Sequence, residues 1–284
     1  MKVSYYPGCS LDGTAREYGE SLEAIAASLG IELEELPDWT CCGASSAHVT
    51  DDRLAFSLAA RNLIIADRVG KDLIVPCAAC YQRLKTAEKG LQHGEPVEGN
   101  TVKYSGKVRV KHSVDFIWEE CGEKAIREKV KKSLAGLNPV CYYGCLTTRP
   151  PDVTDAKAPE DPQAMDNIMN SLDANVRSWS YKTDCCGANL ILTHPEIAKK
   201  LIEKLFDMAL EAGADCIVVG CPMCQSNLDT RQKELSQDNG KQYNIPIYYF
   251  TELMGLAFGD KSVGKWLNRH MTNAKELLKQ KGLL

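Results

Sequence analysis

The sequence predicts an α/β protein of two pseudo-symmetric α/β domains, each built on a parallel sheet. Three observations predict it. A cysteine pattern occurs twice within the 284 residues, short apolar runs alternate with amphipathic stretches, and the cysteines follow the apolar runs. Such alternation is typical of parallel α/β units, whose loops at the strand ends would carry the cysteines. We therefore predict domains at residues 1–136 and 137–284, with the cysteine sites near the interface between them.

The first half contains four predicted elements. Val3 to Tyr6 is expected to be a strand that ends near a cysteine. Thr14 to Leu29 has helical spacing and stops at Gly30, because glycine is the usual residue just after a helix. Asp51 and Asp52 can begin a helix that runs to Val69, since an aspartate side chain accepts hydrogen bonds from free N–H groups of the first turn. Leu73 to Val75 is then expected to be a buried strand.

The second half repeats this order. Pro195 to Ala212 has helical spacing and is followed by Gly213, and Cys216 to Val219 is expected to be a buried strand. Two further segments, Val110 to Trp118 and Ile247 to Leu256, resemble each other. Each is predicted to be a short strand that runs into a helix.

Three segments connect or follow the repeated elements. Lys124 to Asn138 is predicted to be a helix, rich in Lys and Glu, that ends near Gly136 and joins the copies. Arg149 to Pro162 contains four prolines and is expected to be an extended loop. Ala274 to Leu284 is expected to be a basic amphipathic helix exposed to solvent.

Composition and charge exclude several classes of protein. The net charge of −4 gives no electrostatic reason to expect nucleic acid or an anionic membrane as a partner. No apolar run reaches the length of a bilayer span, and the first residues lack a secretory signal pattern, so we expect a cytoplasmic protein without direct membrane insertion. Because no dinucleotide fingerprint, P-loop or His-Glu-x-x-His motif occurs, the chain itself should bind neither nucleotide nor flavin.

Thirteen cysteines are the unusual feature of the composition. Their number is odd, and a cytoplasmic location would keep ordinary thiols reduced. Metal or redox chemistry therefore accounts for them better than disulfide bonds. Three of the cysteines have no counterpart in the other copy. Of these, Cys141 and Cys216 are expected to be buried core residues, and Cys121 is the third.

Ten cysteines form the repeat, which reads twice as C-x(n)-C-C-x34-C-x2-C with n equal to 31 and then 39. Thiolates select zinc, copper(I) or iron–sulfur clusters, and a single zinc uses only four ligands, so five thiolates favour several irons. The ferredoxin spacing is absent, which suggests that electrons arrive from another subunit. The first cysteine set is Cys9, Cys41, Cys42, Cys77 and Cys80, and the second is Cys145, Cys185, Cys186, Cys221 and Cys224.

The doubled pattern resembles the cysteine-rich CCG domain family, and the arrangement is similar to the B subunit of heterodisulfide reductase. The resemblance covers nearly the whole chain and includes Tyr143-Gly144-Cys145-Leu146 with Arg149-Pro150-Pro151. It implies two noncubane 4Fe–4S clusters, one held by each cysteine set. It also implies that a small disulfide binds between the clusters and is split into two thiols by one electron from each.

The resemblance further implies a multi-subunit, electron-bifurcating complex. A ferredoxin-type C subunit would donate electrons, a flavin-containing A subunit would lie beyond it, and hydrogenase or formate dehydrogenase modules are further candidate partners. Here the first cysteine pair continues as Gly43-Ala44-Ser45-Ser46, where members from methanogens have a Pro-rich segment. The substrate is therefore open between the coenzyme M–coenzyme B heterodisulfide, which would place the chain in methanogenesis, and another disulfide or a protein thiol partner.

Two other classes of function fit the same residues. The first is an iron–sulfur electron-transfer subunit of a lactate, glycolate or glycerol-3-phosphate oxidising complex, whose members share the cysteine domain. The second is a non-enzymatic assembly module stabilised by zinc, which has no redox states.

Four residues outside the cysteine sets are further candidates. Gly43 and Gly187 follow the double cysteines and would allow the backbone to approach a cluster closely. His48 is a candidate proton donor to a departing thiolate, because its pKa is ordinarily near neutral, and a loop histidine without a role is the alternative. Arg149 could bind an anionic substrate group or form an exposed ion pair.

Overall fold

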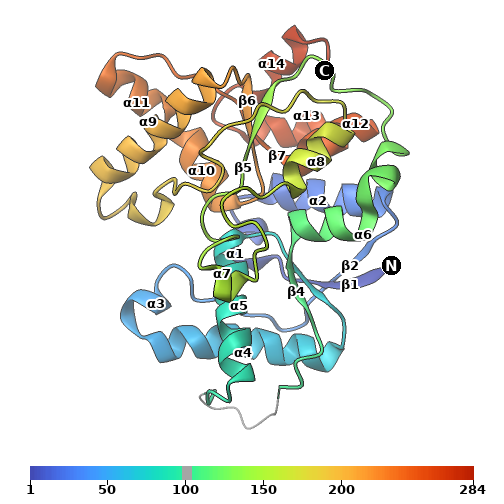
Figure 1. Cartoon of the computed structure of the whole chain (residues 1–284), viewed down its shortest axis with the longest axis vertical. Coiled ribbons are helices and arrows are strands. Elements are labelled where there is room, and N and C mark those ends of the chain that lie inside the picture. The colour runs from blue at the N-terminus through green and yellow to red at the C-terminus, as the bar shows by residue number, and fades with distance from the viewer. Residues whose placement is uncertain (98–103) are drawn as a thin grey trace.

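Two parallel sheets organise the computed structural model, which describes residues 1–97 and 104–284 apart from the side chain of residue 239 (Figure 1). The first sheet has the strand order β2-β1-β3-β4 and the second β5-β6-β7, and every pairing is parallel. This confirms the predicted fold class. The strands are β1 (Lys2–Tyr5), β2 (Glu32–Glu35), β3 (Leu73–Val75), β4 (Val110–His112), β5 (Pro139–Tyr142), β6 (Cys216–Val219) and β7 (Ile247–Tyr249).

The helices of the first half include those predicted from periodicity. The Asp51 carboxylate accepts hydrogen bonds from the N–H groups of Arg53 and Leu54, so it caps α4 as expected, and α4 ends at Gly70. The edge strand β2 and the helices α1, α3 and α5 lie outside the predicted elements. The helices are α1 (Gly8–Asp12), α2 (Arg16–Ser28), α3 (Ala47–Thr50), α4 (Asp52–Val69), α5 (Ala78–Gln92) and α6 (Ser113–Arg127).

The second half confirms the helix after the double cysteine and the strand-to-helix segment at Ile247. Its α-helices are α7 (Pro151–Thr154), α8 (Ala164–Ser171), α9 (Pro195–Glu211), α10 (Pro222–Thr230), α11 (Gln232–Asn239), α12 (Phe250–Phe258), α13 (Val263–Trp266) and α14 (Ala274–Gln280). Two 3₁₀ turns, η1 (Ala188–Leu190) and η2 (Leu267–Arg269), complete it.

The predicted joining helix over Lys124 to Asn138 is wrong. Helix α6 ends at Arg127, and the chain then crosses to the second half without regular structure. The N–H groups of Lys131 and Lys132 donate to the carbonyl of Ala257, and Leu134 is fully buried. Contacts with the second half therefore outweigh the helical preference of a Lys- and Glu-rich segment.

Two other expectations need correction. The segment from Arg149 to Pro162 is not extended throughout, because it contains α7, which begins at Pro151; proline suits the first position of a helix. The C-terminal helix α14 is not simply exposed to solvent. Leu278 on α14 and Leu283 after it are buried, so this segment packs on the core.

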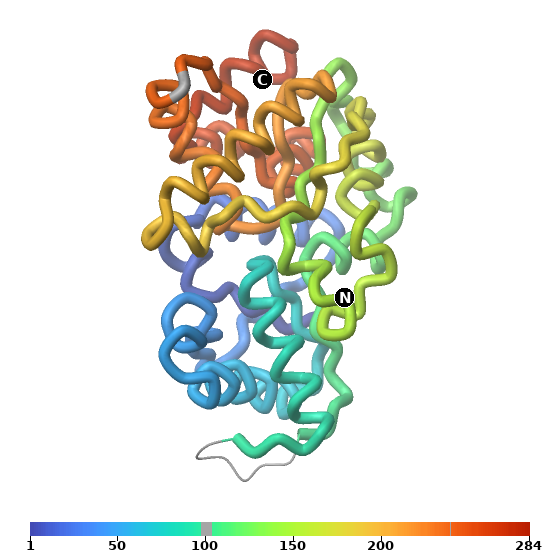
Figure 2. Tube along the Cα trace, turned by 60° about the vertical axis from the view of Figure 1, so that its left-hand side comes forward, coloured from blue at the N-terminus to red at the C-terminus, as the bar shows by residue number. Residues whose placement is uncertain are grey.

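Helices of each half pack on helices of the other half. Helix α2 lies against α12, and α6 lies against α8 (Figures 1 and 2). The hydroxyl groups of Ser21 and Thr251 are 2.6 Å apart across the first contact. The predicted boundary at residue 136 lies between the two sheets in sequence, and the division into two domains remains a prediction.

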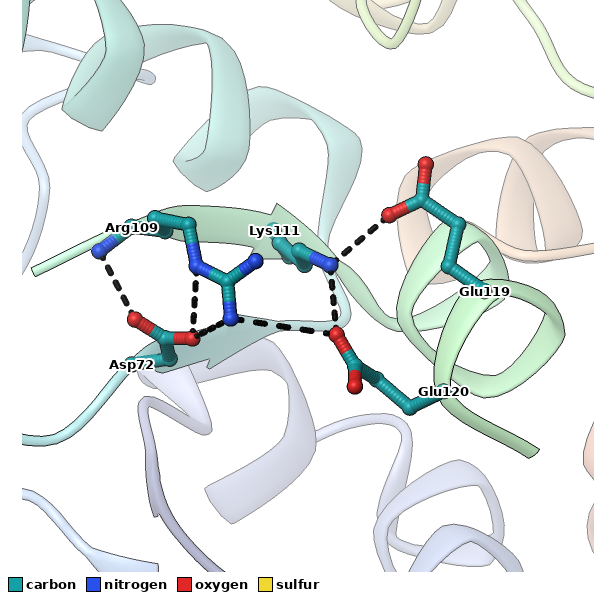
Figure 3. A network of polar contacts seen from close by, with 5 residues as sticks. All are labelled: Asp72, Arg109, Lys111, Glu119 and Glu120. Atoms are coloured by element: carbon teal, nitrogen blue, oxygen red, sulfur yellow. Dashed lines mark hydrogen bonds and ion pairs between the residues drawn. The ribbon is translucent and has the colours of Figure 1, made fainter.

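Charged side chains fasten α6 to the sheet of the first half (Figure 3). The Lys111 ammonium lies 2.7 Å from Glu119 and 2.8 Å from Glu120, both on α6. Arg109, two residues earlier, pairs with Asp72 and lies 3.8 Å from Glu120. Because these groups flank β4, they fix the direction in which α6 leaves the sheet.

Candidate metal centres

Cysteines cluster where the strands of both sheets end. Cys77 follows the end of β3 by two residues, and Cys221 follows the end of β6 by two residues. Cys9 and Cys145 come soon after β1 and β5, which lie beside those strands. Because carboxyl ends of parallel strands meet at one edge of a sheet, residues distant in sequence are brought together there.

The first cysteine set is joined by close thiol contacts. The Sγ atoms of Cys42 and Cys80 are 3.1 Å apart, and Cys42 and Cys80 interact in turn with Cys41 and Cys77. The N–H of Gly43 donates to the Sγ of Cys41 over 3.4 Å. Cys9, the fifth member of the set, is exposed.

The second cysteine set surrounds one cavity of about 60 Å³. All five of its cysteines line this cavity, and Ala78 and Ala79 of the first half close it from α5. The Sγ atoms of Cys186 and Cys224 are 3.7 Å apart, and the N–H of Gly187 donates to Cys185 over 3.2 Å. The contacts of the first set therefore recur at equivalent positions.

Thiol–thiol hydrogen bonds alter the acidity of both sets. Hydrogen bonds from Cys41 and Cys80 lower the pKa of Cys42 to about 3. A hydrogen bond from Cys145, supported by the N–H of Gly187, lowers the pKa of Cys185 to about 6. A thiolate is the form of cysteine that binds metal, so the lowered pKa values of Cys42 and Cys185 favour metal binding.

A tyrosine that we did not predict as a site residue lies among the thiols of each set. Tyr6 donates a hydrogen bond to the carbonyl of Thr40 over 2.7 Å, and Tyr142 donates to the carbonyl of Asp184 over 2.6 Å. Both carbonyls directly precede the double cysteine. Burial and then the nearby thiols raise the pKa of both tyrosines, so they remain neutral donors. The signal was present, because each tyrosine stands three residues before the first cysteine of its repeat.

Gly43 and Gly187 bring their N–H groups close to the cysteine sulfurs, and the role expected of them beside a cluster stays a prediction. Both have left-handed backbone conformations, with φ of +78° and +76°. A Cβ on Gly187 would meet the backbone of Ala198 at 2.9 Å, so the absent side chain allows the cysteine loop to pack on α9. Gly8 and Gly144 also lie close to sulfur, because a Cβ there would be 3.1 Å from the Sγ atoms of Cys80 and Cys224 respectively.

The remaining candidates lie outside the thiol contacts. His48 is on α3, and its Nδ1 is buried without a hydrogen-bond partner among the described residues. Arg149 pairs with Glu160 at 2.5 Å and donates to Thr183, so it forms the ion pair that was one of its two expected roles. Cys141 and Cys216 are fully buried in strands, as predicted for core residues, and Cys121 is half-buried.

The donor set suits a multinuclear group better than one ion. In the second half, five thiols line the wall of one cavity, which is one more than a single zinc ion uses. Soft thiolate donors of this number fit an iron–sulfur cluster.

The sequence is similar to a known protein family and to individual proteins from other organisms. The family model "CCG: Cysteine-rich domain" matches residues 3–85 and 140–229. A protein of Wolinella succinogenes named 8-methylmenaquinol:fumarate reductase membrane anchor subunit is 29% identical, over 97% of this chain and 99% of its own. The B subunit of the ferredoxin/F420H2-dependent CoB-CoM heterodisulfide reductase of Methanosarcina acetivorans is 26% identical, over 91% of this chain and 89% of its own.

A solved structure shares the fold. The crystal structure of a hypothetical protein from Helicobacter pylori matches 95% of this chain with a TM-score of 0.75 at 13% identity. This chain spans about half of that one, 52% of its length. Within the described residues, none of the helices combines the length and apolar character needed to cross a membrane.

Proposed function

The chain belongs to the CCG cysteine-rich domain family, and we propose that each of its cysteine sets holds one noncubane 4Fe–4S cluster. We further propose that the pair forms the catalytic centre of a heterodisulfide reductase-type complex that reduces a disulfide to two thiols. The observation that carries the proposal is the convergence of all five thiols of the second set on one cavity, with matching contacts in the first set.

The chain's own residues would prepare and shield these centres. When bound, an iron–sulfur cluster supplies one-electron redox chemistry and an affinity for sulfur. The N–H groups of Gly43 and Gly187 hold the sulfurs of Cys41 and Cys185 in place. Ala78 and Ala79 contribute apolar groups to the lining of the second cavity.

The proposed reaction consumes two electrons and two protons for each disulfide. The S–S bond breaks, each sulfur gains one electron, and each thiolate takes up one proton to give a thiol. We propose His48 as one proton donor, since its buried Nδ1 has no hydrogen-bond partner among the described residues. No other acid, base or nucleophile is needed in this scheme.

We also propose the partners and the place of work. The Methanosarcina relative is named as a subunit of a reductase complex, which supports partner subunits for this chain as well. A ferredoxin-type subunit would deliver electrons in the cytoplasm, and a flavin-containing subunit would in turn supply that donor.

A second candidate function follows from the Wolinella relative. Its name describes a membrane anchor of a methylmenaquinol:fumarate reductase, and its similarity extends over almost the full length of both chains. In this alternative the chain would hold such a complex at the membrane.

Metal analysis of anaerobically purified protein tests the first proposal. About eight irons with equal sulfide per chain, and a paramagnetic signal that appears when a thiol is added under oxidising conditions, are expected of two four-iron clusters that bind sulfur. Turnover of a disulfide with a reduced viologen should accompany it. About two zincs and no iron would overturn the redox proposal. If the protein holds iron but shows neither a thiol response nor disulfide turnover, the result favours an electron-transfer subunit. That subunit would belong either to a complex of the methylmenaquinol:fumarate reductase type or to a hydroxy-acid-oxidising complex.

A further inference from the structure

The buried hydroxyl group of Tyr18 lies next to the two loops that lead into Cys77 of the first cysteine set and Cys221 of the second. Tyr18 on α2 is fully buried, and its hydroxyl lies 3.0 Å from the carbonyl of Gly220 and 3.5 Å from the carbonyl of Pro76. Gly220 and Pro76 directly precede Cys221 and Cys77. Tyr18 therefore touches the backbone that positions a cysteine of each set.

The direction of these hydrogen bonds can be assigned. A phenol has one proton, and the carbonyl of Gly220 is the nearer acceptor, so Tyr18 donates to Gly220. The hydroxyl of Ser113, 2.9 Å from that of Tyr18, then donates to the Tyr18 oxygen. Ser113 begins α6 and is also fully buried.

His112, next to Ser113, holds the other carbonyl. Its Nε2 lies 3.1 Å from the carbonyl of Pro76, so Nε2 must carry a proton and donate it. Its ring lies edge-on to Tyr81 with centroids 5.8 Å apart. Two consecutive residues of the first half thus hold the loops that lead into Cys77 and Cys221, one directly and one through Tyr18.

The cysteines behind these carbonyls are themselves in contact. Cys77 and Cys221 are both buried, and their thiols interact with each other although they belong to different sets. A displacement of either loop would therefore change the separation of the two proposed centres.

We propose that Tyr18 is a positioning residue that sets the spacing between the two centres. Its hydroxyl group donates to the Gly220 carbonyl and accepts from Ser113, and so ties the Gly220–Cys221 loop to the start of α6, where His112 holds the Pro76–Cys77 loop. The inference rests on the proposed function, because it requires a cluster in each set. Tyr18 is not itself a ligand or a catalytic residue. It acts through the backbone of the cysteine loops.

The test compares two buried tyrosines. The variant Y18F keeps the ring, which stacks on Tyr249 at 4.3 Å and 6°, and removes only the hydroxyl. The control Y248F also removes one buried hydroxyl, which donates to the carbonyl of Ala274 at 2.5 Å, away from both cysteine sets. Both variants and the parent chain are purified anaerobically and assayed for iron, for midpoint potentials, and by paramagnetic resonance after reduction with dithionite.

Y18F is expected to retain the iron of the parent, to shift the midpoint potentials of both centres, and to weaken the magnetic interaction between them. Y248F is expected to match the parent in all three. Unchanged spectra and potentials in Y18F at full iron content would overturn the inference. If the parent itself holds no iron, the proposed function has failed instead. If Y18F alone fails to bind iron, the variant S113A, which removes the hydrogen-bond donor to Tyr18, is used instead. S113A should show the same changes in potential and magnetic interaction to a smaller degree. Spectra and potentials of S113A equal to those of the parent would overturn the inference.

Discussion

The Sγ atoms of Cys42 and Cys80 lie 3.1 Å apart, although 38 residues separate them in the chain. The same separation of 38 residues joins Cys186 and Cys224, at 3.7 Å. In both halves the intervening segment contains a long helix and then a buried strand, which return the chain to the same sheet edge; these are α4 and β3 in the first half and α9 and β6 in the second. The identical x34 interval in the sequence therefore corresponds to a similar arrangement in space in the two copies.

Removing one of these thiols should empty one centre. We expect Cys42→Ser to lower the iron content from about eight to about four per chain, because a serine hydroxyl is a poor ligand for iron–sulfur clusters and only the first set loses a thiolate. Cys216→Ala is the control, since this thiol is buried in β6 outside both sets. Iron and sulfide analysis decides the outcome. A Cys42→Ser chain with the full iron content would contradict the assignment of the first set.

The glycine after the second double cysteine should not tolerate alanine. Gly187 and Gly213 both have left-handed φ, and alanine in that conformation costs about 1–2 kcal/mol. At Gly213 the added methyl group meets only the Arg177 side chain at 3.8 Å, whereas at Gly187 it meets the Cα of Ala198 at 2.9 Å. Gly187→Ala should therefore lower the melting temperature more than Gly213→Ala does. It should also reduce bound iron by about half, because only the second four-iron centre is displaced. Equal effects of the two variants would refute this role for Gly187.

Periodicity and spacing were sufficient to predict the repeat, the parallel sheets and the helices α2, α4 and α9, but not α5. Helix α4 was predictable because Asp51 and Gly70 mark its ends locally. The segment after Arg127 was not, because Leu134 and the N–H groups of Lys131 and Lys132 find their partners in the second half. Local patterns in a sequence do not reveal which carbonyl group, far away in the chain, will accept a hydrogen bond.

The same limit applies to the cysteine sites. The sequence identified ten thiols by their repeated spacing, but it did not show that Cys77 and Cys221 of different sets would touch. Tyr18 could not be found at all, because its partners lie 95 and 202 residues away in the chain. By contrast, Tyr6 and Tyr142 stand at matching positions in both repeats and could have been recognised.

Asp115 offers a prediction about stability. Burial, together with the charge of Glu119, raises the pKa of Asp115 to about 6. For an acid with a raised pKa, the charged form is disfavoured in the folded chain, so folding loses up to about 3 kcal/mol as the pH rises from below 4 to above 6. We expect Asp115→Asn to raise the melting temperature by several degrees at pH 7.5 and to have little effect near pH 4. The control is Asp152→Asn, at an exposed position in the first turn of α7. It should leave the melting temperature unchanged both at pH 7.5 and near pH 4. An Asp115→Asn chain no more stable than the parent at pH 7.5 would show that the carboxylate is compensated.

The buried pair of Glu252 and His270 should make stability fall in alkaline solution. Their side chains are fully buried, and the His270 Nε2 lies 2.9 Å from the Glu252 carboxylate. Burial by itself would lower the pKa of His270, but Glu252, with Asp229 and Glu17 nearby, outweighs it and raises the pKa to about 9. Since histidine in an unfolded chain titrates near 6.5, the pair's contribution is complete below that pH and is lost as the pH rises through about 9.

The double variant Glu252→Gln/His270→Asn removes both charges, while the introduced glutamine can still accept the N–H of Tyr249, which in the parent donates to the Glu252 carboxylate. The parent should lose about 3 kcal/mol more than this variant between pH 6.5 and 9.5, by the difference between the two pKa values of His270. Melting temperatures of both chains, measured at four pH values across this range, give this difference in stability. Because both chains contain the same cysteines, the titration of the cysteines affects both chains equally. The control pair is Lys199 and Asp238, an exposed contact of 2.8 Å whose removal should alter the curve little, because exposed ion pairs contribute little to stability. If the parent and the double variant lose stability in parallel from pH 6.5 to 9.5, His270 is not charged in the folded chain, and its contact with Glu252 is a hydrogen bond from a neutral ring.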